Sequence, residues 1–245
     1  RVKLVVAYDG TNYCGWQVQP NGITIEGVLN RELSKLLKED IVVIGASRTD
    51  SGVHSYGNVA VFDTNARMPA EKISYALNQR LPDDIVVQNS SEIPLDWHPR
   101  HCNSRKTYEY RILNREFPMP QRRLDTWFVY RKLNIPAMCE AAEQFEGTHD
   151  FKSFCSVNTA VEDTIRTIYS CEVEKDGNDI ITIRVTGNGF LYNMVRIIAG
   201  TLIRVGGGEM LPDEMPQILG RKDRAAAGPT APAHGLTMMG IEYGE

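Results

Sequence analysis

The chain has 245 residues, of which 42% are hydrophobic and 24% charged, so it can fill the core of one large or two small domains. No apolar run approaches the roughly 18 residues of a membrane-spanning helix, and the first residues follow a strand pattern rather than that of a signal peptide. The five scattered cysteines form no Cys-x-x-Cys pair, which argues against a disulfide framework or a zinc site and favours a reduced, cytoplasmic setting.

The first half of the chain predicts the order strand, helix, strand, strand, helix, strand, which is typical of a ferredoxin-like unit. The polar loop at 10–22, which carries Tyr13 and Trp16, follows the first strand, and Thr24 is the expected N-cap of the first helix. The expected elements are strands at Val2–Asp9, Ile41–Ala46, Gly57–Phe62 and from Ile85, and helices at Thr24–Lys38 and Pro69–Arg80.

The second half partly repeats this order, so we expect a second α+β lobe. The expected strands are Lys106–Asn114, a strand around Phe128, a hairpin of Ile165–Glu174 with Asp179–Thr186, and a last strand at Thr237–Tyr243. The expected helices are Pro136–Phe145, a long helix from Asn188 or Gly189 to Val205, and a short one at Asp213–Leu219. The predicted domains are therefore 1–103 and 104–245.

Charge is distributed unevenly along the chain, although the formal net charge is only −4. Residues 98–132 hold nine Lys or Arg against three acids, a net of +6, whereas residues 137–180 hold three against ten, a net of −7. The basic region could bind a polyanion while the acidic region faces away from it. Two ordinary solvated faces would give the same pattern, and charge alone does not separate these interpretations.

A polar turn between two predicted strands carries the first candidate for chemistry, Asp50. Arg48 lies two residues before it, so in an extended segment both side chains leave the same face. The guanidinium could then keep the carboxylate ionised and fix its orientation, as a nucleophile or general base requires. An ordinary turn, with Arg48 in solvent, fits the same residues.

Two further candidates lie in the second half. Tyr108 shares one face of its strand with Lys106 and Tyr110, which also fits tyrosines that simply pack on a half-buried sheet. Arg196 lies in a helix that is apolar almost all round, so it needs an anionic partner. A structural ion pair with some other acid explains Arg196 equally well.

Several separated segments resemble the tRNA pseudouridine synthase A (TruA) family, in that family's order along the chain. The resemblance covers the chain from Tyr8 to Tyr243. The segments are Tyr-Asp-Gly-Thr-x-Tyr-x-Gly-Trp-Gln (8–17), Ser-Arg-Thr-Asp-Ser-Gly-Val-His-Ser (47–55), Trp-His-Pro-Arg (97–100), Arg-Lys-Thr-Tyr-Glu-Tyr (105–110), Gly-Asn-Gly-Phe-Leu-Tyr-Asn-Met-Val-Arg (187–196) and Ala-Pro-Ala-His-Gly-Leu (231–236). Ser47 and Ser51 stand where Gly and Ala are commoner in the family, and Asn193 stands where His is also common.

The resemblance implies a fold and a reaction. The fold would be α+β, with two ferredoxin-like lobes whose antiparallel sheets join around a central cleft and whose helices cover the outer faces. The reaction would be the isomerisation of uridine to pseudouridine in the tRNA anticodon stem–loop, at about positions 38 to 40, without a cofactor or metal. A homodimer is implied as well.

The resemblance also implies site residues. Asp50 would be the catalytic residue, either attacking C1′ or acting as a base at C2′, with Arg48 and Arg196 holding it ionised. Tyr108 and Leu236 would hold the target uracil. The remaining residues expected to bind substrate are Arg100, Arg105, Lys106 and Asn193, whereas His234 is expected to take no part in proton transfer. The alternative function is a non-catalytic RNA-binding module or tRNA chaperone.

Overall fold

The computed structural model describes residues 1–157 and 162–244 as two compact units. Unit 1 comprises residues 1–104 together with the chain from 237 onward, and unit 2 comprises residues 105–236. The first boundary lies one residue from the predicted one. The last strand differs from the prediction, because it belongs to unit 1 and not to the C-terminal lobe. Within the described ranges, no helix has the length and apolar composition needed to cross a bilayer.

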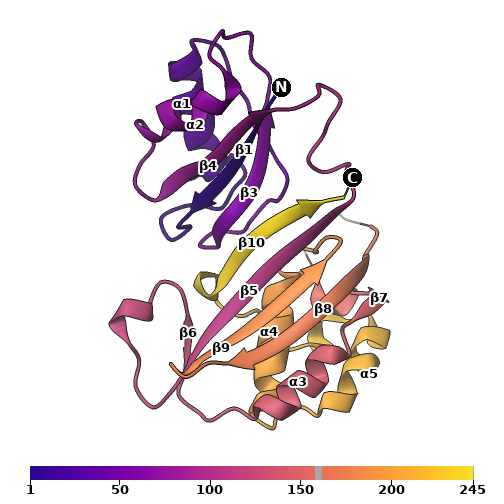
Figure 1. Ribbon diagram of the computed structural model, residues 1–245. Coiled ribbons are helices and arrows are strands. Elements are labelled where there is room, and N and C mark those ends of the chain that lie inside the picture. Colours follow the sequence, from indigo (N-terminus) through magenta and orange to yellow (C-terminus); the bar gives the residue numbers. More distant parts are fainter. Residues whose placement is uncertain (158–161, 245) are drawn as a thin grey trace. The chain divides into compact units, whose positions relative to one another are not determined.

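Unit 1 has the predicted strand and helix order, with its two helices side by side (Figure 1). Its elements are β1 (Val2–Tyr8), α1 (Ile25–Leu37), β2 (Ile44–Gly45), β3 (His54–Phe62), α2 (Ala70–Asn78), β4 (Ile85–Glu92) and β10 (Leu236–Tyr243). Strand β10 belongs to this unit from Thr237 onward. β1 pairs antiparallel with β4 and with β3, and β2 pairs antiparallel with β3. The strand order β4-β1-β3-β2 is that of the split βαβ unit predicted from the sequence.

The alternation of apolar residues along β1 explains how unit 1 builds its core. Val2, Leu4 and Val6 are buried against α1 and α2, while the residues between them are half-buried. Thr24 caps α1 as predicted, because its Oγ1 accepts a hydrogen bond from the backbone N–H of Gly27. β10 adds to this unit by pairing parallel with the start of β3, where Thr237 lies opposite His54.

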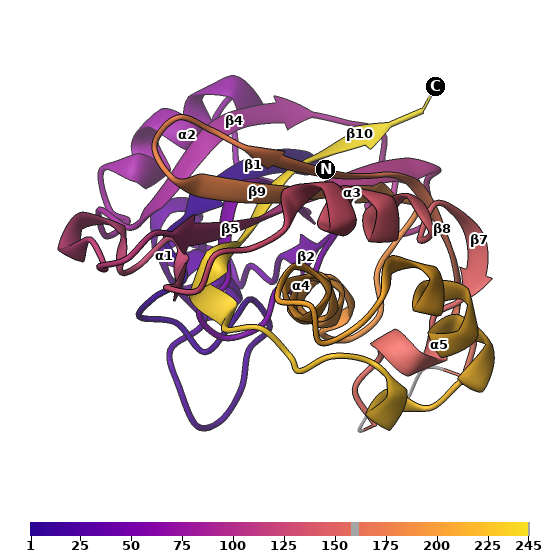
Figure 2. The ribbon, with the colours of Figure 1, turned by 90° about the horizontal axis from the view of Figure 1, so that it is seen from below.

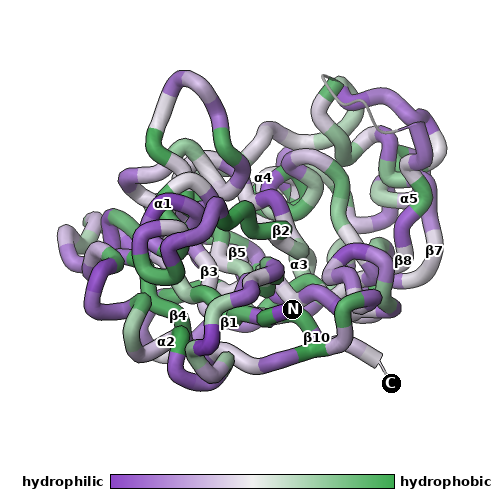
Figure 3. The backbone as a smooth tube through the Cα atoms, turned by 90° about the horizontal axis from the view of Figure 1, so that it is seen from above, coloured by the Kyte–Doolittle hydropathy of each residue, from purple (hydrophilic) through white to green (hydrophobic). Residues whose placement is uncertain are grey.

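Unit 2 is also α+β, with an antiparallel sheet in the order β5-β9-β8-β7 and a short strand, β6, parallel to β5. The strands are β5 (Ser104–Asn114), β6 (Trp127–Val129), β7 (Gly147–Asp150), β8 (Ile165–Lys175) and β9 (Ile180–Gly187), and β5 belongs to this unit from Arg105 onward. The helices are α3 (Ile135–Glu143), α4 (Met194–Gly206) and α5 (Met215–Arg221). The three helices lie on the same side of β9 (Figure 2). In both units hydrophobic stretches alternate with hydrophilic loops (Figure 3).

At three elements, β2, β7 and α4, the structure differs from the prediction for a local reason. Strand β2 contains only two residues, because the backbone N–H groups of Ile41 and Val43 donate hydrogen bonds to side chains of α1 rather than to a neighbouring strand. Strand β7 was not predicted, since Gly-Thr-His-Asp shows no apolar alternation. Helix α4 begins at Met194, because Asn193 has a left-handed backbone with φ of 62° that cannot continue a helix.

Candidate active site

Asp50 lies on the polar turn between β2 and β3, as the sequence predicts. Its backbone carbonyl accepts a hydrogen bond from the N–H of Val53 at 3.2 Å, and Gly52 has φ of 78°, a conformation that glycine adopts without steric cost. The Asp50 side chain is half-buried, whereas the next residue, Ser51, is exposed. The turn therefore holds the carboxylate of Asp50 at the border between the protein interior and solvent.

The loop that follows β1 holds this turn from one side. The N–H of Gly52 and the hydroxyl of Ser51 both donate to the carbonyl of Tyr13, at 3.3 and 3.1 Å, and the N–H of Trp16 donates to the carbonyl of Thr49 at 3.0 Å. Ser51, which replaces the commoner alanine, therefore adds a hydrogen bond to the turn. These contacts fix the two backbone positions that flank Asp50.

Buried polar side chains of β1 and β3 form hydrogen bonds with the residues that lead into the turn. The hydroxyl groups of Tyr8 and Thr49 lie 2.7 Å apart. The amide of Asn58 is fully buried and bonds both to the N–H and to the carbonyl of Ser47, at 3.3 and 2.9 Å. Because buried polar groups are costly to leave unpaired, these contacts give the segment from Ser47 to Thr49 a single arrangement.

Two guanidinium groups lie near the turn within unit 1. Arg48 is exposed, and Arg100 donates from Nε to the carbonyl of Gly45 at 2.7 Å. Desolvation and the nearby charge of Arg48 lower the pKa of Arg100. These residues place positive charge beside a turn that carries a carboxylate, which favours the binding of a phosphodiester. The expected pairing of Arg48 with Asp50 stays a prediction.

Tyr108 lies on β5 in unit 2, where it is 9% exposed. Its ring packs edge-on against Phe190, with the ring centroids 5.2 Å apart. Tyr110, two residues further along the strand, is fully buried and donates its hydroxyl hydrogen to the carbonyl of Pro232 at 2.8 Å. Burial raises the pKa of Tyr110 far above its ordinary value, so it remains a neutral donor. Phe190 was not singled out from the sequence, although it lies within one of the family segments.

Arg196 lies in the first turn of α4, and two of its nitrogens are held inside unit 2. Its Nε donates to the carbonyl of Ala231 at 2.7 Å, and its Nη1 donates to Oδ1 of Asn193 at 2.7 Å. The N–H of Ala231 in turn donates to the carbonyl of Arg196. The guanidinium is therefore fixed by neutral oxygens, and its expected pairing with an anionic partner stays a prediction.

The segment that leads to Leu236 links these groups of unit 2. The carbonyl of Ala231 accepts a hydrogen bond from Arg196, and the carbonyl of Pro232 accepts one from Tyr110. Leu236 itself is buried. His234, in the short turn before Leu236, is half-buried. Arg196 and β5, the strand that carries Tyr108, are thus connected within one unit through the segment that leads to Leu236.

The remaining residues expected to bind substrate have different surroundings. Arg105 is exposed, and its guanidinium lies over the ring of Tyr169, 4.7 Å from the centroid. Lys106 is half-buried. Asn193 contacts Arg196 directly, so its position favours a role in holding that arginine. Among residues 1–157 and 162–244, no group of His, Cys, Asp and Glu has the arrangement of a metal site.

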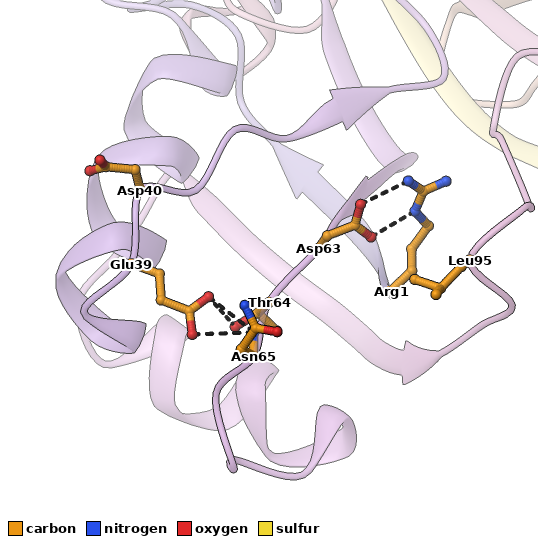
Figure 4. A pocket seen from close by; sticks show the side chains of 7 residues that line it. All are labelled: Arg1, Glu39, Asp40, Asp63, Thr64, Asn65 and Leu95. Atoms are coloured by element: carbon orange, nitrogen blue, oxygen red, sulfur yellow. Dashed lines mark hydrogen bonds and ion pairs between the residues drawn. The ribbon is translucent and has the colours of Figure 1, made fainter.

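A separate open cavity of about 630 Å³ lies in unit 1 and is lined by none of the predicted site residues. Its lining residues are Arg1, Glu39, Asp40, Asp63, Thr64, Asn65 and Leu95 (Figure 4). Asp63 is paired with Arg1 at 2.9 Å, and Glu39 accepts hydrogen bonds from Thr64 and Asn65. Its acidic lining is unsuited to a polyanionic substrate.

The chain matches known proteins over most of its length. The family described as tRNA pseudouridine synthase matches residues 4–101 and 141–244. The tRNA pseudouridine synthase A of Ruminiclostridium cellulolyticum is 48% identical over 243 residues, which cover 99% of both chains. That of Thermoanaerobacter sp. is 49% identical over 242 residues, and that of Acetivibrio thermocellus 46% over 242 residues, again with 99% of both chains covered.

Likeness to solved structures is weak. A chain from a complex titled "Structure of H/ACA RNP bound to a substrate RNA containing 2'-deoxyuridine" covers 97% of this chain, which covers 45% of it, at 13% identity and a TM-score of 0.37. Likeness at this level carries no argument about fold or function. The match over most of the chain and the high identity to full-length relatives are decisive, and the chain belongs to the tRNA pseudouridine synthase family.

Proposed function

We propose that this enzyme isomerises uridine to pseudouridine in the anticodon stem–loop of tRNA, at about positions 38 to 40, and that Asp50 carries the reaction. The observation that carries the proposal is the turn of Asp50. A half-buried carboxylate lies on a segment that Tyr8, Tyr13 and Asn58 hold by hydrogen bonds from two sides. A carboxylate fixed in this way is suited to nucleophilic or base chemistry.

The reaction breaks one bond and forms another without a net change in atoms. The N1–C1′ glycosidic bond breaks, the uracil turns while it remains bound, and C5 forms a bond to C1′. The proton on C5 leaves and N1 acquires a proton, so the product is an isomer of the substrate. Asp50 either attacks C1′ and forms a transient ester that C5 then displaces, or removes a proton from C2′ and returns it once C5 has bonded to C1′. Both routes need an ionised carboxylate.

The target base must leave its stack before this chemistry can occur. Unstacking costs a few kcal/mol, and contacts with the phosphates can offset this cost. We infer that Tyr108 stacks on the uracil and that Leu236 packs against it, so that the detached base cannot diffuse away. Phe190 supports this role, because its edge-on contact restricts the ring of Tyr108.

We infer that Arg48 and Arg196 keep the carboxylate of Asp50 ionised, since a nearby cation lowers the pKa of a carboxyl group. Arg100, Arg105 and Lys106 would contact the tRNA backbone, within the stretch of the chain that has a net charge of +6. A homodimer that receives tRNA across both subunits, in the reducing cytoplasm, completes the proposal.

A tritium-release assay tests the proposal directly, because the proton on C5 is lost for each pseudouridine formed. The substrate is tRNA labelled with [5-³H]uridine, and the proteins are the wild type, Asp50→Ala and the exposed control Asp40→Ala. We expect release with the wild type and the control, and none with Asp50→Ala, which should keep its fold and much of its affinity for tRNA.

Each outcome has a distinct meaning. Release by Asp50→Ala at a rate near that of the wild type would overturn the assignment of Asp50. A wild type that binds tRNA tightly but releases no tritium from any tRNA would favour the RNA-binding module or chaperone instead. Mapping pseudouridines in tRNA from cells that lack the protein would show which uridines it modifies.

A further inference from the structure

Asn193 stands at an unusual point in unit 2, immediately before α4. Its φ of 62° places it in the left-handed region, which few residues other than glycine adopt and in which asparagine is enriched. It begins the helix without a side-chain cap, since its amide makes no capping hydrogen bond to α4. Asn193 therefore adopts an uncommon backbone conformation, and its side chain makes contacts other than a helix cap.

The amide of Asn193 joins two segments that lie 37 residues apart in the sequence. Its Oδ1 accepts a hydrogen bond from Nη1 of Arg196 at 2.7 Å, and its Nδ2 donates to Oγ of Ser156 at 2.8 Å. The N–H of Ser156 donates to the carbonyl of Tyr192 at 3.1 Å, so the backbone next to Ser156 is bonded as well. The result is a short chain of hydrogen bonds from Ser156 through Asn193 to the guanidinium of Arg196.

The chemistry of these groups fixes their orientation. A guanidinium can only donate, so it must face the amide oxygen of Asn193, and the amide NH₂ then faces Ser156. Ala231 accepts from the second nitrogen, Nε, at 2.7 Å. Two donors of one planar group are thus bonded to two oxygens, which sets the plane of the guanidinium as well as its position.

The location of Arg196 explains why such support is needed. It lies in the first turn of α4, where the helix macrodipole disfavours a cation, and that turn contains no acidic residue. At this helix end the oxygens of Asn193 and Ala231 accept hydrogen bonds from its guanidinium.

We propose that Ser156 and Asn193 are positioning residues for Arg196, which aim its guanidinium for the isomerisation. The inference rests on the proposed function, because it gives Arg196 a role in catalysis. It assigns a role to Ser156, and it changes that of Asn193 from a contact with substrate to the support of a catalytic group.

The first test separates the amide of Asn193 from its backbone. Asn193→Gly keeps the left-handed conformation and removes the amide, while Ser156→Ala removes the hydroxyl at the other end of the chain. We expect kcat to fall about 10- to 100-fold for Asn193→Gly and less for Ser156→Ala, with KM for tRNA within about two-fold of the wild type, since only positioning is lost.

A matched control lies three residues from Ser156. The hydroxyl of Ser153 is fully buried, donates to the carbonyl of Ile218 at 2.6 Å and accepts from the N–H of Asp223 at 3.0 Å, and neither partner belongs to the chain of hydrogen bonds from Ser156 to Arg196. Ser153→Ala should lower the melting temperature and leave kcat unchanged. A merely structural role for Ser156 would make the two serine variants behave alike.

The second test uses a pH profile, which a structural role would not alter. A neutral imidazole has one acceptor and one donor, the two functions that the amide of Asn193 uses here, so Asn193→His should restore much of the activity lost in Asn193→Gly. Arg196 is the charged residue that the described structure places against this side chain. A protonated imidazole cannot accept from it, so this variant should lose activity as the pH falls below about 6.5, where the wild type does not.

The outcomes separate this inference from the proposed function. If Asn193→Gly and Ser156→Ala keep the kcat of the wild type while Arg196→Met is inactive, the positioning role is wrong and the catalytic assignment stands. A pH profile of Asn193→His parallel to that of the wild type would also overturn the positioning role. If Arg196→Met is itself fully active, the role of Arg196 in the proposed function is wrong.

Discussion

The hydroxyl oxygens of Tyr8 and Thr49 lie 2.7 Å apart in the buried interior of unit 1, one residue before Asp50. Tyr8 ends β1 and Thr49 belongs to the turn between β2 and β3, so the bond joins segments 41 residues apart. The ring of Tyr8 also packs against Trp16, with the ring centroids 5.9 Å apart. This contact ties the predicted catalytic turn to the core of the unit.

Thr49→Val should therefore damage both stability and activity. Valine has nearly the shape of threonine but lacks the hydroxyl, so the change leaves Tyr8 without this partner. We expect the free energy of unfolding to fall by about 1 to 2 kcal/mol. We also expect kcat to fall while KM for tRNA changes little. Denaturant unfolding and steady-state kinetics check this, with Thr148→Val on exposed β7 as the control; equal effects in both variants would contradict it.

Gly15→Ala should disturb the same turn through its backbone. Gly15 has φ of 81°, and a Cβ added there would lie 2.6 Å from the carbonyl oxygen of Thr49 and 3.0 Å from the carbonyl carbon of Asp50. Residue 15 or the turn must shift, because the atoms too close to the added Cβ are backbone atoms of the turn.

We expect Gly15→Ala to cost about 1 to 3 kcal/mol of stability and to lower kcat by more than that loss alone explains. Gly177→Ala is the matched control, because a Cβ there meets nothing within 4 Å. Thermal unfolding and tritium release measure the two effects. Wild-type activity in Gly15→Ala would show that the position of the turn is unimportant for the reaction.

Arg196→Met should separate a catalytic arginine from a structural one. Methionine fits the apolar helix but leaves the oxygens of Ala231 and Asn193 without this donor, so we expect the variant to fold with a melting temperature lowered by a few degrees. Activity should nevertheless fall by about 100-fold or more, because the proposed function places this positive charge beside the carboxylate of Asp50.

Arg221→Met provides the comparison for Arg196→Met, since Arg221 is an exposed residue at the end of α5. Its activity should match that of the wild type. Equal and small effects in the two variants would return Arg196 to a structural role.

Glu109 on β5 should make unit 2 sensitive to acid. It is 4% exposed and pairs with Arg184 at 2.6 Å and with Arg111 at 2.9 Å. Burial alone would raise the pKa of Glu109, but the hydrogen bonds and charges of these two arginines outweigh it and hold the pKa below the ordinary 4.5. The carboxylate thus contributes stability above about pH 4.5, and this contribution is lost as the pH falls through the lowered value.

Glu109→Gln should accordingly lower the free energy of unfolding at pH 7 by about 1 to 3 kcal/mol. The difference between variant and wild type should shrink as the pH falls below the ordinary pKa of the carboxyl group. Denaturant unfolding at a series of pH values checks the sign, with Glu174→Gln on the exposed part of β8 as the control. A difference that stays constant down to pH 3 would exclude the proposed linkage.

The sequence by itself determined most of the local structure and the family. The cap at Thr24, the turn at Asp50 and the alternation along β1 all depend on residues close together in the chain, so short-range patterns predict them. The segments that resemble the family were sufficient to identify the family, whereas the roles given to individual residues stay predictions.

Only the tertiary structure decided what holds those residues in place. The bonds from Tyr8 to Thr49, from Arg100 to Gly45 and from Ser156 to Asn193 join positions 41, 55 and 37 residues apart. The parallel pairing of β10 with β3 likewise joins the end of the chain to unit 1. No local pattern encodes such contacts, because which distant groups meet is set by how helices and strands pack, and packing depends on the whole chain at once.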